Sequence, residues 1–277
     1  MSPDMAGKDL YSLTQNIFLV AREILSTVKP LLPAAPITID AREAISQNFF
    51  RILKDEEVSY LMERLPFPCS PLLLLIPVIH RSLFRAVMIA VFQPFGHRGL
   101  DQPTEQLLSN IYTYLGETET QDRRSRWRTL TYQHISRERP ANVWIQPAVQ
   151  YYQQLQAMLQ PFLKGARLPG EKQLQSSISA IFEQAVTTRD KVMTECTEVD
   201  CSVVLPTHGR FTSWMKPFSP VNKNPPQRCI FPLSWVVQFS LSRGQGQQPE
   251  WFNSIYAIVL ADNSSLPTSI RDLDKLG

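Results

Sequence analysis

Three cysteines and one histidine in the last third of the sequence are of the residue types that bind zinc. Cysteine thiolates and imidazole nitrogens are preferred zinc ligands, but structural sites use short, paired spacings. Here the gaps are four, six and twenty residues, and Cys229 falls on the apolar face of a predicted strand, where a free thiol simply packs. We therefore expect no cofactor, and retain zinc as the weaker alternative. The candidate ligands are Cys196, Cys201, His208 and Cys229.

A run of arginines between residues 122 and 139 could bind an anionic partner. The stretch DRRSRWRTLTYQHISRER holds six arginines and two acids, whereas the whole chain carries a net charge of only +3. If this run is a helix, one arc of it carries Trp127, Leu130 and His134. We expect Trp127 and Leu130 to anchor the helix. The arginines lie within this arc or on both of its flanks, unlike the one-sided stripe of a groove-binding helix.

Two interpretations of this run stay open. Guanidinium groups match carboxylates and phosphates bidentately, which favours recognition of a partner. A solvated helix with surface ion pairs is the other interpretation. We expect removal of the four arginines in 123–128 together to leave stability near-unchanged and to weaken partner binding clearly. The candidate binding residues are Arg123, Arg124, Arg126, Arg128, Arg137 and Arg139.

A second basic window, residues 201–249, contains no acidic residue. Cations alternating with aromatic side chains are typical of single-stranded nucleic-acid binding, so nucleic-acid binding through 122–139 and 201–249 is an alternative function. Half of the aromatics also fall on the buried face of a predicted strand, which favours a core role for them. The candidate residues are Arg210, Trp214, Lys216, Lys223 and Arg228.

Other chemistry has weaker support. His97 and Arg98 lie in a glycine-containing turn just before a predicted helix start, where an anion could bind, although an ordinary turn is the stronger interpretation. The sequence contains no G-x-S-x-G, HExxH, Walker A or dinucleotide-binding glycine motif. We therefore do not expect an enzyme, and a site built from dispersed catalytic residues is the second alternative.

The distribution of apolar and charged residues bounds the class of protein. Apolar residues make up 43% of the 277, which is typical of a folded globular chain. The segment 71–92 is the most apolar, but a proline, a histidine and two arginines interrupt it, so we expect a buried core helix and no membrane partner. Four irregularly spaced cysteines and no secretory signal at the N-terminus predict an intracellular protein of the nucleus or cytoplasm.

Apolar residues at spacings of three and four predict helices in the first two-thirds of the chain. The predicted ranges are 10–28, 41–53, 103–116, 148–162 and 174–192. The first of these carries a wide apolar stripe that faces either the core of the chain or another subunit. The residues of this candidate partner helix are Leu13, Ile17, Val20 and Ile24.

The C-terminal part changes to the period-two alternation of strands. The runs 229–241 and 251–261 predict an antiparallel hairpin, residues 202–205 a third strand, and Pro232 an edge position. The predicted fold class is therefore mainly α: a multi-helix region over about 1–195 and a smaller β-hairpin-containing region over 196–277. Whether the two share one core stays open.

These observations favour a non-enzymatic interaction or assembly subunit, a scaffold-like component of a complex that docks an acidic or helical protein partner. Its basic residues gather in two acid-free windows, 64–100 and 201–249, and in the run 122–139, which indicates a polarised surface. Homo- and hetero-oligomers are both compatible with the pattern.

Overall fold

The computed structural model describes most of the chain, with gaps at the loops and at the C-terminus. The described residues are 1–64, 67–92, 101–138, 140–163, 166, 168–207, 209–210, 212–213, 215–217, 228–241 and 250–261.

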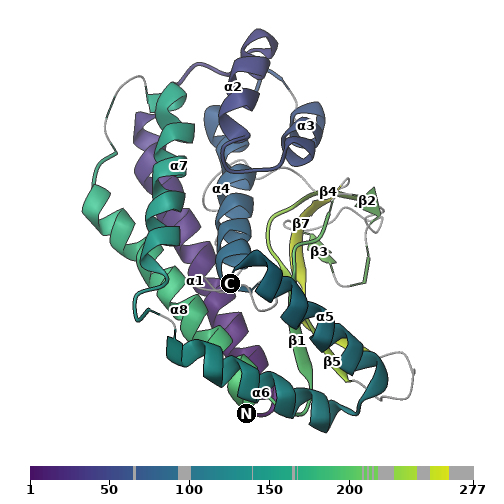
Figure 1. Cartoon of the computed structure of the whole chain (residues 1–277). Helices are drawn as coiled ribbons and strands as arrows, with labels where there is room; N and C mark the ends of the chain where they lie inside the picture. Colours follow the sequence, from purple (N-terminus) through teal and green to yellow (C-terminus); the bar gives the residue numbers. More distant parts are fainter. Residues whose placement is uncertain are drawn as a thin grey trace.

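Four long helices lie side by side and form the body of the molecule (Figure 1). They are α1 (Pro3–Val28), α4 (Pro71–Val87), α7 (Ile145–Leu163) and α8 (Glu171–Glu195). The short helices α2 (Arg42–Phe49) and α3 (Asp55–Arg64) lie at one end of this bundle, and α6 (Gln121–Glu138) crosses the other end (Figure 1). Helix α5 (Gln102–Thr118) packs on α6 across a two-residue connection.

Helix α1 buries the stripe that its sequence predicts. Its start is fixed by Ser2, whose hydroxyl accepts a hydrogen bond from the Met5 N–H, and by Pro3 in the first turn. The stripe residues pack against α4 and α8 and belong to the main hydrophobic core. The four residues of the candidate partner helix, Leu13, Ile17, Val20 and Ile24, are all buried there. This face is therefore used within the chain and is not presented to another subunit.

Helix α4 is the central apolar helix. Ser70 caps it by accepting from the Leu73 N–H at 3.2 Å, and it continues into a π-helical turn, η3 (Met88–Phe92). Pro71–Phe92 has the length and hydropathy of a membrane span, and 67% of its most apolar window is buried inside the fold. Neighbouring helices and strands thus cover most of this helix, as in the core helix that the sequence predicts.

The C-terminal strands form two sheets (Figure 1). One has the order β1-β5-β6, with β1 (Asp200–Val204), β5 (Val236–Leu241) and β6 (Glu250–Ile255). The other has the order β2-β4-β7-β3, with β2 (Gly209–Arg210), β4 (Arg228–Pro232), β7 (Ala257–Ala261) and β3 (Met215–Pro217).

Each of the two predicted strand runs is split between these sheets. The antiparallel pairing is present, as β5 with β6 and as β4 with β7, and the third strand is β1. The edge prediction from Pro232 is wrong for the strand, because β4 lies between β2 and β7. Proline is tolerated there because β2 pairs only with Arg228 and Cys229, so no ladder partner on that side needs an N–H from Pro232.

The helices and the first sheet share one hydrophobic core. Trp235 lies at their junction, fully buried, with its ring edge-on to Phe84 at 4.9 Å and to Phe92 at 5.4 Å. Its indole N–H donates to the Thr14 hydroxyl at 2.9 Å, which ties the sheet to α1. The mainly α fold class with a smaller C-terminal β region is confirmed.

Candidate functional site

Helix α6 turns a polar arc, not an apolar one, toward the body of the protein. Gln121, Ser125, Arg128 and Tyr132 follow one another at spacings of four, three and four, and all are buried. Within this arc the Gln121 amide donates to the Ser125 hydroxyl at 2.7 Å, and the Tyr132 hydroxyl donates to Asp190 of α8 at 2.7 Å. Hydrogen bonds therefore hold α6 in place where most amphipathic helices use apolar packing.

Arg128 is the centre of this attachment. Its guanidinium reaches the C-terminal end of α8 and donates to the carbonyls of Met193, at 3.3 Å, and of Cys196. It also donates to the Val199 carbonyl at 3.4 Å. The last carbonyls of a helix lack intrahelical partners and carry the negative end of its dipole, so a buried cation is favourable at this position.

Asp200 supplies the counter-charge at the start of β1. It forms ion pairs with Arg128 and with Arg124, the latter at 2.7 Å, and their side chains are 2% and 13% exposed. The Tyr112 hydroxyl of α5 also donates to Asp200, and the Arg124 guanidinium lies 4.1 Å from the centre of the Tyr112 ring. Burial raises the pKa of Tyr112, which keeps the phenol protonated as a donor. The network thus joins α5, α6, α8 and β1.

Two expectations for the arginine run are corrected by this geometry. Arg124 and Arg128 are largely withdrawn from solvent, because Asp200 pairs with both and the end of α8 accepts from Arg128. Leu130 does not anchor the helix, since its side chain points to solvent with 62% exposed. The helical prediction for this segment is confirmed by α6.

The opposite arc of α6 faces solvent. Leu130 lies on it with Trp127 and His134, and the arginines at 123, 126 and 137 are also exposed on this side. Arg123 pairs with Glu119 at 3.0 Å, while Arg126 and Arg137 form no ion pair with a described residue. The ring of Trp127, half-buried, stacks on Tyr112 of α5 with centroids 6.0 Å apart.

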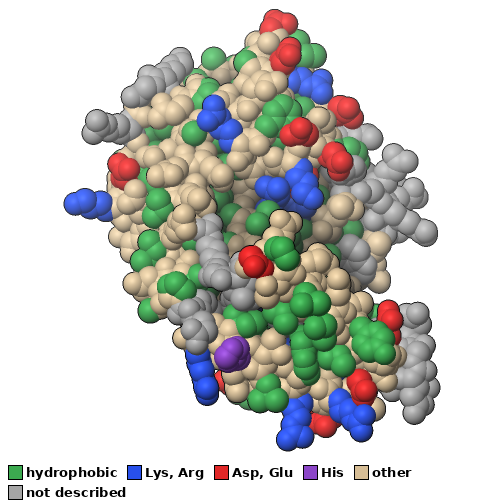
Figure 2. Space-filling model, viewed as in Figure 1, with side chains coloured by type: hydrophobic (Ala, Val, Ile, Leu, Met, Phe, Trp, Pro, Cys, Tyr) green, Lys and Arg blue, Asp and Glu red, His purple; other side chains and the backbone are tan. Residues whose placement is uncertain are grey.

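Helix α5 extends this exposed surface. All of its residues are described and none is fully buried, and Leu107 and Tyr114 are 59% and 63% exposed. Figure 2 shows hydrophobic side chains gathered over α5 and α6 on one face of the molecule, with basic side chains at the lower edge. We call the solvent-facing surface of these two helices the α5–α6 face; its exposed or half-buried side chains include Leu107, Tyr114, Trp127, Leu130, Arg126 and Arg137.

In the part of the chain that the structure describes, the three proposed cysteine ligands do not form a metal-binding group. Within that part, no three His, Cys, Asp or Glu side chains form a group that could hold a metal, and His208 lies outside it. Cys229 is buried among Met215, Val236, Ala257 and Val259, which is the packing role. Burial raises the pKa of the Cys229 thiol to about 12 and also raises those of Cys196 and Cys201.

The second basic window is only partly described. Lys216 is exposed, and its ammonium lies 4.4 Å from the centre of the Tyr256 ring. Phe231, Trp235 and Phe239 are buried in the core and cannot stack on bases. The backbones of Arg210 and Arg228 pair in β2 and β4. The candidates Trp214, Lys223 and Arg139 lie outside the described residues, as do His97 and Arg98 of the proposed anion turn.

Several residues that matter in the structure were missed from the sequence. Asp200 and Tyr112 were not singled out, because their role depends on arginines far from Asp200 in sequence. The one available signal is that Asp200 is the last acid before the acid-free window 201–249. Arg81 and Arg85 were noted only as interruptions of an apolar segment, although they line a cavity.

Comparison with protein-family models, with characterised proteins and with solved structures finds no match for this chain.

Proposed function

We propose that this chain is an interaction subunit that docks a protein partner on the α5–α6 face. The observation that carries the proposal is the orientation of α6, whose polar arc is buried and whose Leu130 arc is exposed. Burying a polar arc requires the hydrogen bonds and ion pairs described above, and leaving Leu107, Tyr114 and Leu130 in water forgoes the favourable burial of apolar surface. A partner that covers them would regain it.

The composition of the face indicates the chemistry of that partner. Exposed aromatic and arginine side chains around an apolar centre are typical of protein interfaces, in which such residues dominate the binding energy. Arg126 and Arg137 are exposed cations without an ion pair among the described residues. The complementary surface is an apolar one, such as the stripe of an amphipathic helix, flanked by aspartate or glutamate.

Nucleic acid fits this face less well. Two of the six arginines in the run pair internally with Asp200, whose single charge balances one of them, and Glu119 pairs with a third. Phosphate backbones are bound by broad cationic surfaces, whereas the centre of this face is apolar. Binding to RNA or DNA is therefore the alternative result that the test below can detect.

The test compares captured partners between the wild-type chain and face variants, and then measures affinity for the purified partner. Leu130→Asp should weaken binding roughly tenfold or more, because it places a charge in the apolar centre of the interface. The double variant Arg126→Glu, Arg137→Glu should slow association most strongly at low salt. The matched controls Ile39→Asp and Arg51→Glu change an exposed apolar residue and an exposed cation elsewhere, and should bind normally.

Unchanged affinity of the folded face variants would refute the proposal. Captured material that disappears on nuclease treatment, and binding that falls steeply with salt, would replace it with the nucleic-acid function.

A further inference from the structure

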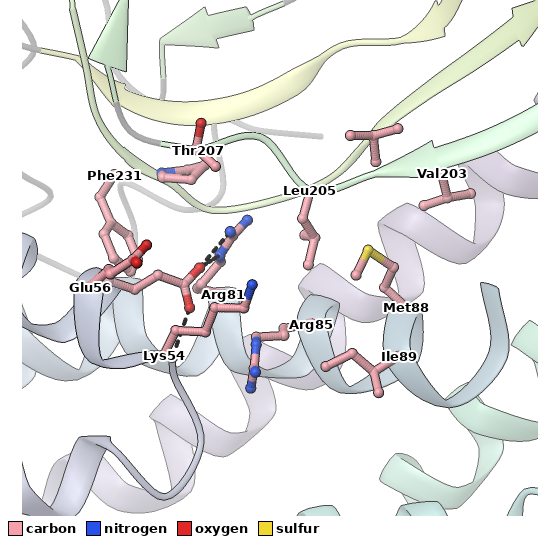
Figure 3. Close-up of a pocket in the computed structure, with 13 residues that line it drawn as sticks. Lys54, Glu56, Arg81, Arg85, Met88, Ile89, Val203, Leu205, Thr207 and Phe231 are labelled. Carbon is pink, nitrogen blue, oxygen red and sulfur yellow. Dashed lines mark hydrogen bonds and ion pairs between the residues drawn. The ribbon is translucent and has the colours of Figure 1, made fainter. Parts of the chain in front are cut away.

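A cavity separate from the α5–α6 face lies between α3, α4 and the strands. Its volume is about 410 Å³, within the range of small-molecule sites. The start of α3 lines it on one side, the end of α4 and η3 on another, and β1 with the segment after it closes it from the sheet side (Figure 3).

One end of the cavity is polar and holds a buried ion pair. Glu57 accepts from Arg81 Nε at 2.6 Å and from its Nη2 at 2.5 Å, and its second oxygen accepts from the Lys54 N–H at 3.0 Å. Glu57 thereby caps the start of α3 and neutralises Arg81. Arg81 Nη2 also donates to the Pro206 carbonyl at 3.0 Å, which fixes the guanidinium against the segment that follows β1.

The same end has donors that the protein leaves unused. Arg81 Nη1 is buried and has no hydrogen-bond partner among the described residues. Arg85, one turn further along α4, donates from Nη1 to the Ile52 carbonyl at 3.3 Å, and its other N–H groups contact no described acceptor. The Lys54 ammonium forms no ion pair with a described residue, and Glu56 lies exposed at the rim. Three cations and two carboxylates line the cavity, so its net charge is +1.

The other end of the cavity is apolar. Met88 and Ile89 lie on one side of it and Val203 and Leu205 on the other, with Phe231 near the ion pair (Figure 3). A ligand that lies along the cavity would therefore meet cations at its head and aliphatic side chains along its body.

We propose that this cavity binds a small amphipathic monoanion: a carboxylate whose head contacts Arg85, Lys54 and Arg81 and whose apolar body lies against Met88, Ile89 and Leu205. Arginine guanidinium groups match a planar carboxylate, and one negative charge balances the net charge of the lining. The site does not depend on the α5–α6 face.

Octanoate is the probe, with octanol as the neutral analogue of the same chain length and acetate as the head without the tail. Calorimetric titration of the full chain should give saturable binding of one octanoate, at least about tenfold tighter than octanol, which lacks the charge that the cations bind, or acetate, which lacks the apolar chain. Arg85→Gln should weaken octanoate binding about tenfold and leave octanol binding unchanged.

The controls separate loss of the site from loss of the fold. Lys172→Gln removes an exposed cation on α8 and should leave octanoate binding unchanged. Lys54→Gln changes an exposed side chain and replaces Arg85→Gln if that variant fails to fold; it should weaken octanoate binding several-fold. Equal binding of octanoate and octanol, unchanged octanoate affinity in the folded cation variant, or no saturable octanoate binding would each overturn the proposal.

Discussion

Replacing Asp200 with asparagine tests whether the attachment of α6 depends on a buried charge. The substitution keeps the size of the side chain and removes the negative charge that faces Arg128 and Arg124. Removing one partner of a buried pair costs about 3–5 kcal/mol, because the remaining charge is left uncompensated away from water. Arg128 keeps its carbonyl acceptors at the end of α8, so we expect the lower end, about 3 kcal/mol. That loss should lower the melting temperature by roughly 6–12 °C.

The assay is urea unfolding monitored by tryptophan fluorescence. Asp122→Asn removes an exposed acid from the same helix and should change the free energy of unfolding by no more than about 0.5 kcal/mol. A second matched pair, Arg128→Met and Arg126→Met, compares a buried with an exposed arginine two positions apart. The double variant Asp200→Asn, Arg128→Met should lose less stability than the sum of its single variants.

A loss below about 1 kcal/mol for Asp200→Asn, where 3–5 is usual for a broken buried pair, would refute this reasoning. So would equal losses for Arg128→Met and Arg126→Met. The sequence-based expectation of near-unchanged stability on removal of all four arginines in 123–128 is replaced by a large destabilisation, which comes from Arg124 and Arg128 alone.

Thr14→Val should lower the free energy of unfolding by about 1–3 kcal/mol, because it leaves the buried indole N–H of Trp235 without an acceptor. Both Thr14 and Thr27 donate to the carbonyl four residues earlier in α1, but only Thr14 also accepts from Trp235, so Thr27→Val should cost less. Urea unfolding of the two variants checks this, and equal losses would contradict it. Burial lowers the pKa of His80 to about 4, so the unfolded chain binds the proton more tightly than the folded chain does. The contribution of neutral His80 to stability is therefore complete above about pH 6.5 and is lost as the pH falls toward 4. Between pH 7 and pH 5 the wild-type chain should lose about 2 kcal/mol of unfolding free energy through His80, and the His80→Gln variant should not show this loss. If the unfolding free energies of the two proteins fall in parallel with pH, this mechanism is excluded.

Periodicity predicted α1, α7 and α8 because their apolar stripes face the common core. The stripe of α1 and the start of α5 near Pro103 follow directly from local residue types, and Asp101 caps α5 by accepting from the Thr104 N–H at 2.7 Å. The strand runs were located but not divided, because the break between β4 and β5 comes from packing on the helices, not from a turn motif.

The orientation of α6 could not be predicted from its own residues. Periodicity assumes that the apolar arc is the buried one, and here Arg128 finds acceptors 65 to 72 residues further along the chain. Without those partners the polar arc would be costly to bury, so the choice of face is a tertiary effect. The cavity was missed for the same reason, since Arg81 meets Glu57 from a different helix.

The junction between Trp235 and Thr14 has a consequence for how the chain is made. The two residues are 221 positions apart, and a ribosome that adds about 5–20 residues per second needs roughly 10–40 s to join them. For most of that interval the stripe of α1 lacks α8, and β5 is made last, whereas α4 is made early. We therefore expect the nascent chain to be most prone to aggregation before its last strands emerge.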